Sequence, residues 1–209
     1  MDTQAPSPAP PYGPIMTRLL PALRRAFLVV NRTTAAPALR AGLGPLLVTP
    51  VTGSILLLRT RGRRSGLVRE APLGYVVHDG AIYVCAGFGR GTAWLANLSA
   101  DPSVGVILPG ARIRATAREV TDRAEYDVAL RELIRALGVV GAATVPAALD
   151  PGAAIPDAWF ATLPLVRLEP VAMLAGPWDP GGRGWIGIAL VDAALLALIF
   201  GCLRRRAQA

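Results

Sequence analysis

The stretch LVREAPLGYVVHDGAIYVCAG, residues 67–87, decides the fold class. Both of its halves are rich in β-branched and aromatic residues, and His78-Asp79-Gly80 between them is a tight-turn signal. The pattern predicts two antiparallel strands, residues 67–77 and 81–87, that form a hairpin. Pro72 has no N–H to donate, so it marks a bulge or an edge position in the first strand.

Four more short strands are expected around this hairpin, at residues 55–60, 103–108, 112–120 and 163–171. Helices are expected at residues 92–100, after the capping box of Asp122 and Glu125, and at residues 157–162. Parallel neighbours would need long crossovers that these spacings do not leave. The sequence therefore predicts a mainly β or α+β fold, a six-stranded antiparallel barrel with peripheral helices at residues 43–175.

The composition is that of one ordinary domain with an appended element. The chain has 209 residues, of which 53% are hydrophobic, 17% charged and 6% aromatic. This balance excludes disorder, collagen and several domains. Cys85, Cys202 and the single histidine, His78, are too few and too far apart for a zinc site or a disulfide framework. Synthesis in a reducing cytoplasm is the default expectation.

Positive charge is concentrated in the first third of the chain. Every one of the 22 cationic residues is an arginine, and ten of them lie in residues 1–70 with only two acidic residues. The rest of the chain is balanced, which suggests an anionic partner: a lipid surface, a phosphorylated cofactor or nucleic acid. Nucleic acid is not expected, because Tyr12 and Phe27 are the only aromatic residues available there for base stacking.

The N-terminal region is expected to be a proline-rich disordered lead, residues 1–13, followed by a broken amphipathic helix at residues 14–42. Two interpretations of this helix are open. It lies in the interface of an anionic membrane with its arginines among the phosphates, or it covers one face of the core.

The C-terminal region continues through a linker, residues 176–184, into the apolar residues 185–203 and a basic tail, residues 204–209. Nineteen helical residues span about 28 Å, close to the thickness of a bilayer core. Asp192 argues against this at a cost of about 2.5–3.5 kcal/mol, so a packed hydrophobic helix is the alternative to a membrane-embedded one. The expected location is the cytoplasmic side of the cell membrane, reached through this helix and the basic N-terminal segment.

The turn between the first two strands has the composition of an anion site. Residues 60–66, TRGRRSG, place three guanidinium groups, a hydroxyl and two glycines in one short segment. Arginine forks and backbone N–H groups suit phosphate or carboxylate. A solvated arginine-rich turn is the alternative interpretation.

The order of motifs resembles the deazaflavin-dependent nitroreductase family. The resemblance rests on LLLRTRGRRSG at residues 56–66, then Arg69, Pro72-Leu73 and Tyr75, then Trp94-xx-Asn97-Leu98-x-Ala100-Asp101-Pro102, and the closing VRLEP at residues 166–170. It implies a split β-barrel that binds the deazaflavin coenzyme F420, whose tail carries a phosphodiester and polyglutamate.

The resemblance also implies which residues contact this cofactor. The phosphate would be held by Gly62, Arg63, Arg64 and Ser65, with Arg69 further along. The planar ring would lie against Pro72 and Leu73, near Ala86 and Gly87, with Trp94 and Asn97 lining the cleft. Trp94 could equally anchor its helix in the core, and Asn97 could be a local cap. The loop at residues 86–92 is shorter than is usual in the family and lacks its lysine, so Phe88 or Arg90 would have to replace it.

We therefore expect an F420-dependent oxidoreductase that passes a hydride to a lipophilic acceptor, quinone-like or nitroaromatic, with no metal. Tyr75 is the candidate catalytic hydroxyl, with a core tyrosine as the alternative. An FMN-dependent enzyme on the same barrel and a non-catalytic membrane-anchored binding protein are the rival functions. A homodimer is compatible with the resemblance.

Overall fold

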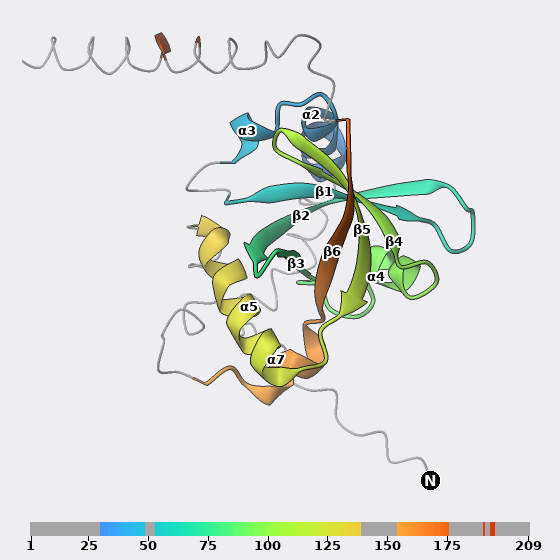
Figure 1. Ribbon diagram of the computed structural model, residues 1–209, viewed down its shortest axis with the longest axis vertical. Coiled ribbons are helices and arrows are strands. Elements are labelled where there is room, and N and C mark those ends of the chain that lie inside the picture. Colours follow the sequence, from blue (N-terminus) through green and yellow to red (C-terminus); the bar gives the residue numbers. More distant parts are fainter. Residues whose placement is uncertain (1–29, 49–52, 139–153, 176–189, 191–192, 195–209) are drawn as a thin grey trace, which may run out of the picture.

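Six strands close into an antiparallel barrel in the order β1-β2-β3-β6-β5-β4 (Figure 1). The computed structural model describes residues 30–48, 53–138, 154–175, 190 and 193–194. The strands are β1 (Ile55–Arg61), β2 (Val68–His78), β3 (Ala81–Cys85), β4 (Ser103–Leu108), β5 (Ala111–Glu119) and β6 (Leu165–Leu174). The six-stranded antiparallel barrel expected from the sequence is confirmed.

Short helices surround this barrel. A π-helical turn η1 (Asn31–Ala35) leads into α2 (Ala36–Arg40) and α3 (Gly44–Leu47). The remaining helices are α4 (Ala93–Leu98) between β3 and β4, α5 (Arg123–Ala136) after β5, and α7 (Asp157–Thr162) before β6.

Local sequence signals explain several element boundaries. The β2–β3 hairpin turns at Asp79 and Gly80, whose φ angles of 46° and 71° are the left-handed values that a two-residue hairpin needs. Helix α5 begins as expected, because the Asp122 carboxylate accepts a hydrogen bond of 2.7 Å from the Glu125 N–H. The expected side-chain cap of α4 is absent: Thr92 is the N-cap residue, but its hydroxyl does not bond to the helix.

The hydrophobic core has one layer inside the barrel and two outside it. Inside, alternate residues of the strands pack with Trp94, Leu95 and Leu98 of α4. Outside, α5 covers β2 and β3, and residues of α5 and α7 pack with Tyr83 of β3 and Leu165 of β6. A third cluster joins α2 to the outer face of β1 and β4 and comprises Ala36, Leu39, Leu57 and Ile107.

That third cluster bears on the N-terminal helix. In the described part of residues 14–42, the buried side chains Ala36 and Leu39 cover the barrel wall. This matches the interpretation of a helix on one face of the core. Residues 14–29, and residues 185–203 apart from Leu190, Ala193 and Ala194, lie outside the described part, so the hydrophobic C-terminal helix is not shown. Within the residues that are described, no helix is long and apolar enough to cross a membrane.

Strand β3 is shorter than the two strands that flank it in the barrel. Strand β2 pairs with β1 from Val68 to Gly74 but with β3 only from Tyr75 to His78. Pro72 therefore lies where β2 pairs on one side only, which is the position that a residue without an N–H can occupy. Strand β6 likewise pairs with β3 only over residues 165–168, which leaves residues 169–174 bonded to β5 alone.

Two glycines test how tightly α5 is joined to the barrel. Both Gly53 (φ 70°) and Gly110 (φ 81°) are left-handed. A Cβ on Gly53 would lie 2.4 Å from the Ala136 carbonyl oxygen, whereas a Cβ on Gly110 would meet nothing within 4 Å. Gly110→Ala should cost about 1–2 kcal/mol of unfolding free energy for its backbone alone. Gly53→Ala should cost about 1–3 kcal/mol more, for the overlap with α5. Urea unfolding of the two variants checks this, and equal midpoints would contradict it.

Candidate cofactor-binding site

Backbone hydrogen bonds close the turn between β1 and β2 into a compact loop. The Gly62 N–H donates to the Leu67 carbonyl at 2.8 Å, and the Gly66 N–H donates to the Gly62 carbonyl at 2.7 Å. Gly66 has φ 66°, so a residue with a side chain would be strained there. The four residues expected to hold phosphate, Gly62, Arg63, Arg64 and Ser65, are thus brought together in one fixed turn.

The side chain of Asn97 in α4 is hydrogen-bonded to this turn and to the end of β1. Its Oδ1 accepts a hydrogen bond of 3.2 Å from the Arg63 N–H, and its Nδ2 donates to the Thr60 hydroxyl at 3.1 Å. Asn97 and Thr60 are only 4% and 2% exposed. The Asn97 amide is therefore engaged by the protein and acts as a positioning group, rather than as the local cap considered from the sequence.

The absence of a side chain at Gly62 leaves room for the Ser65 hydroxyl. A Cβ on Gly62 would stand 2.9 Å from Ser65 Oγ and 3.4 Å from Arg69 Cγ. Arg69 Nη2 in turn donates to Ser65 Oγ at 3.4 Å. Gly62, Ser65 and Arg69 therefore form a closely packed cradle, in which a side chain at residue 62 would displace the Ser65 hydroxyl.

The turn keeps donors available on its outer side. Among the described residues, no group accepts a hydrogen bond from the N–H of Arg64 or Ser65. The exposed side chains of Arg63 and Arg64 form no ion pair there either. Two backbone donors, a hydroxyl and two guanidinium groups are what a phosphate or carboxylate needs.

The structure separates Pro72 from Leu73. Pro72 is opposite Leu57, which belongs to the outer cluster, whereas Leu73 is opposite Leu56 and packs against the barrel interior. Adjacent strand residues face opposite sides, so the two side chains cannot both lie under one ring. Leu73 is the member of the pair that faces the interior.

Tyr75 also packs against the interior cluster and is partly buried. Burial raises the pKa of its phenol above the ordinary value of 10.0, so the hydroxyl stays protonated at neutral pH. Tyr75 lies six positions further along β2 than Arg69, which is about 20 Å at the usual rise. Tyr75 and the turn would therefore contact different parts of one elongated ligand.

The segment from β3 into α4 supplies buried groups. Ala86 and Trp94 lie in the interior core, so Trp94 anchors its helix as the alternative interpretation held, and Gly87 is half-buried. The Thr92 hydroxyl is buried and has no hydrogen-bond partner in the described part of the chain. Such an atom requires a partner, and a polar ligand group would provide one. The sequence suggested only a cap at Thr92, so this candidate contact was missed.

Arg90 is not free to replace the family's lysine. Its guanidinium pairs with both carboxylate oxygens of Glu119, at 2.6 and 3.3 Å, and with the Ala161 carbonyl at 3.1 Å. Cys85 is not a nucleophile, because burial raises the pKa of its thiol to about 12.

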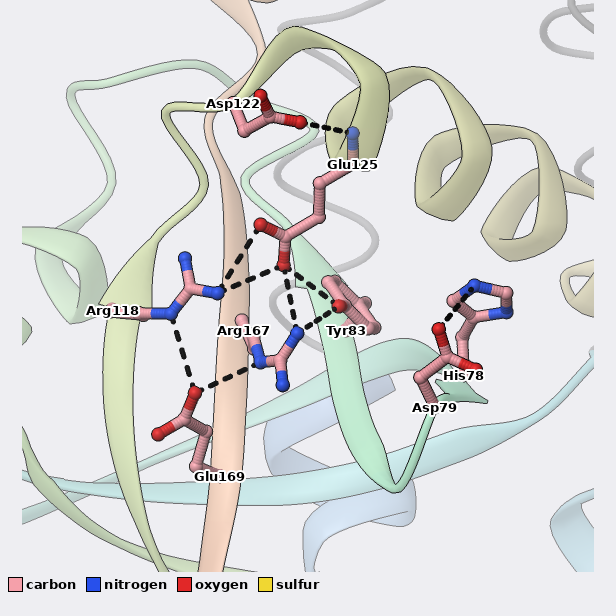
Figure 2. Close-up of polar contacts among 8 residues, drawn as sticks. All are labelled: His78, Asp79, Tyr83, Arg118, Asp122, Glu125, Arg167 and Glu169. Carbon is pink, nitrogen blue, oxygen red and sulfur yellow. Dashed lines mark hydrogen bonds and ion pairs between the residues drawn. The ribbon is translucent and has the colours of Figure 1, made fainter.

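A second polar cluster lies on the outer wall, far from this turn, and sequence reasoning missed it (Figure 2). Its centre is Glu125, which accepts from the Tyr83 hydroxyl at 2.8 Å, from Arg118 at 3.1 Å and from Arg167 at 3.2 Å. Arg167 Nε also lies 3.0 Å from Glu169 Oε1, without hydrogen-bond alignment.

The charged and polar groups of this cluster stabilise the fold. Burial of Glu125 by itself would raise its pKa, but hydrogen bonds from Tyr83, Arg167 and Arg118 outweigh it and lower the pKa. Burial, followed by the bond to Glu125, raises the pKa of Tyr83. The cluster therefore fastens the start of α5 to β3, β5 and β6.

The comparison with known families decides the assignment. Residues 32–138, just over half of the 209 residues, match the family model described as F420H(2)-dependent quinone reductase. The chain belongs to the F420H2-dependent quinone reductase family. Its cofactor is coenzyme F420, and it is an F420-dependent oxidoreductase of the split-barrel type.

Several solved structures are similar to this chain at low sequence identity. An F420-H2 dependent reductase is 23% identical, with a TM-score of 0.41 over 56% of this chain and 94% of that chain. A conserved hypothetical protein from Mycobacterium tuberculosis is 15% identical, with a TM-score of 0.43 over 64% and 81%. A candidate 5-nitroimidazole antibiotic resistance protein from Bacteroides thetaiotaomicron is 11% identical, with a TM-score of 0.46 over 59% and 76%.

The residues of this F420-dependent reductase fit the cofactor. The cradle at Gly62 with the free N–H groups of Arg64 and Ser65 suits the phosphate of the tail, and Arg69 stands beside it. Leu73 and Tyr75, two residues apart on β2 and both packed against the interior cluster, offer an apolar surface for a planar ring. The orphaned Thr92 hydroxyl adds a polar contact.

Replacing Asn97 tests its role as a positioning residue. Asn97→Ala should weaken F420 binding about tenfold, because it removes the bonds that fix the Arg63 N–H and Thr60. Affinity for a deazaflavin that lacks the phosphate tail should stay within about twofold. Asn97→Asp, which still accepts from Arg63, should recover part of the loss. Fluorescence titration with both compounds measures this, and equal losses for the two would mean a general collapse of the fold.

Proposed function

We propose that this F420-dependent reductase transfers a hydride from reduced F420 to a lipophilic quinone at the cytoplasmic face of the membrane. The observation that carries the proposal is the match of residues 32–138 to a family described by its quinone reductase activity. The apolar residues 185–203 and the basic residues 1–70 are consistent with an acceptor that resides in a lipid phase.

Different residues of the chain would bind the cofactor tail, exclude water and donate a hydrogen bond to the acceptor. When bound, the reduced deazaflavin supplies the hydride. The turn at residues 62–67 neutralises and fixes the anionic tail. The apolar barrel interior beside Leu73 excludes water from the reacting face. A quinone that receives a hydride becomes a hydroquinone anion, and the protonated Tyr75 hydroxyl would donate a hydrogen bond to the oxygen on which that charge develops.

The acceptor is tested directly. The full chain with reduced F420 should reduce menadione, and the visible absorbance of oxidised F420 should rise until one equivalent of quinone has been consumed for each F420 oxidised. A nitroaromatic serves as the comparison acceptor. A higher kcat/KM for the nitroaromatic would overturn the quinone assignment while leaving the F420-dependent chemistry in place. No turnover with either acceptor, despite F420 binding, would favour a binding-only protein.

Arginine substitutions test the anion site. Arg63→Ala and Arg64→Ala should each weaken F420 binding about tenfold, because each removes one charge-assisted contact from a solvent-exposed turn. Arg114→Ala removes the same charge from the exposed part of β5 and should have no effect. Titrations at low and high salt give the affinities. Similar F420 affinities for the wild type and all three variants would refute the phosphate assignment.

Tyr75→Phe tests the catalytic hydroxyl. With saturating F420, kcat should fall by up to about tenfold, because the variant loses one hydrogen bond to the transition state. The affinity for F420 should stay constant. Because the Tyr75 pKa lies above 10.0, the wild-type rate should show no loss from this group between pH 7 and pH 9. Tyr83→Phe, on the outer wall, is the control and should lower stability without a specific loss in kcat. An unchanged kcat for Tyr75→Phe would leave Tyr75 as a core residue.

A further inference from the structure

The loop at residues 86–92 joins β3 to α4 and begins in the barrel interior. Ala86 belongs to the same interior cluster against which Leu73 and Tyr75 pack, and these two residues offer the surface for the cofactor ring. At the other end of the loop, Thr92 is 8% exposed, and its hydroxyl has no hydrogen-bond partner in the described part of the chain. The course of this loop therefore affects the shape of the ring site.

Backbone hydrogen bonds fold the loop and fix its start. The Gly89 N–H donates to the Ala86 carbonyl at 2.7 Å, and the Thr92 N–H donates to the Gly89 carbonyl at 3.3 Å. The Ala86 N–H donates to the Pro164 carbonyl at 2.9 Å. Gly89 has φ 80°, and its Cβ position is 3.5 Å from the Thr162 carbonyl oxygen. The middle of the loop thus passes close to the end of α7.

Arg90 connects this middle part to two elements that are distant in sequence. Its Nη2 and Nη1 donate to the two carboxylate oxygens of Glu119, at 2.6 and 3.3 Å. Its Nε donates to the Ala161 carbonyl in α7 at 3.1 Å. A planar guanidinium can bond to these three acceptors at once, whereas a lysine ammonium lacks the fork that this geometry needs.

The acceptors of Arg90 are themselves held in place. Ala161 lies between Trp159 and Leu163, and the buried Tyr126 hydroxyl is 3.0 Å from the carbonyl oxygens of both. Glu119 is the last residue of β5 and is paired with β6 in the sheet. Arg90 therefore fastens the loop to a fixed part of the fold.

Helix α4 is held independently of Arg90. Trp94, Leu95 and Leu98 pack in the barrel interior, and Asn97 is bonded to the β1–β2 hairpin. Loss of the Arg90 contacts would therefore loosen the loop without releasing Asn97 from the anion turn. The contributions of the loop and of the turn to binding can be separated for this reason.

We propose that Arg90 and Glu119 form a positioning pair, which holds the loop at residues 86–92 in place beside the deazaflavin ring. The Arg90 guanidinium acts through the loop and does not touch the cofactor, because its donors are engaged by Glu119 and Ala161. A loop that is ordered before binding lowers the entropic cost of placing the ring. The proposal depends on the F420 cofactor and is independent of the acceptor.

Fluorescence titration of the full chain tests the pair, with F420 and with a deazaflavin that lacks the phosphate tail. Arg90→Ala should weaken the binding of both compounds about fivefold, the upper range for an exposed ion pair. Glu119→Gln should weaken both about threefold. The double variant should bind no more weakly than Arg90→Ala, because the two residues act as one unit. Arg90→Lys should recover little of the loss.

A neighbouring arginine on β5 provides the matched control. Arg118 is 44% exposed, against 55% for Arg90, and its carboxylate partners lie on the outer wall (Figure 2). Arg118→Ala should leave both affinities unchanged. The thermal midpoints of the Arg90 and Glu119 variants should stay within about 4 °C of the wild type, which separates a loss of binding from unfolding.

Three outcomes would overturn the proposal. If Arg90→Ala weakens binding while Glu119→Gln leaves it unchanged or strengthens it, Arg90 contacts the cofactor directly. A loss seen with F420 but not with the tail-free deazaflavin would place the effect at the anion turn. Unchanged affinities in every variant would mean that the ring site does not depend on the pair. None of these outcomes bears on whether the acceptor is a quinone.

Discussion

The length of β3 is the constraint on which the rest of this barrel depends. A strand of five residues is paired between strands of eleven and ten residues, so neither neighbour can be bonded along its whole length. The part of β2 that is bonded to β1 alone continues into the turn at residues 62–67, and residues 169–174 of β6 are bonded to β5 alone. One short strand thus leaves part of β2 and part of β6 bonded on one side only, and the first of these parts leads into the candidate cofactor site.

The arginines of this lysine-free chain serve two different purposes, which their partners distinguish. On the outer wall, Arg118 and Arg167 are held by Glu125 and Glu169, and they fasten α5 to the sheet. At the β1–β2 turn, Arg63 and Arg64 have no carboxylate partner among the described residues. A cation that the fold has already neutralised cannot attract an anionic ligand, so the unpaired arginines are the ones available for the F420 tail.

The fold was predictable because its signals are local. The Asp79-Gly80 turn, the Asp122 cap and the limits of α7 follow from residues adjacent in sequence, and each is found where the pattern placed it. The residue types in the turn at residues 60–66 were also enough to predict a candidate anion site. The contact of Asn97 with Thr60 and Arg63 was not, because it joins residues 37 and 34 positions apart. Nor could spacing show that Glu119 pairs with Arg90, or that alternation would separate Pro72 from Leu73.

Asn97 shows why such distant contacts matter for function. Burying an amide is unfavourable unless both its ends are bonded, and here each end finds one partner on the β1–β2 hairpin. The bond to the Arg63 N–H fixes the start of the turn, and the Gly62–Leu67 and Gly66–Gly62 bonds fix its closure. In the described part of the chain, the N–H groups of Arg64 and Ser65 are then the ones of the turn that have no hydrogen-bond acceptor. Because the turn is held by these hydrogen bonds without a ligand, an anion that bound there would not have to order it, and the entropic cost of binding would be lower.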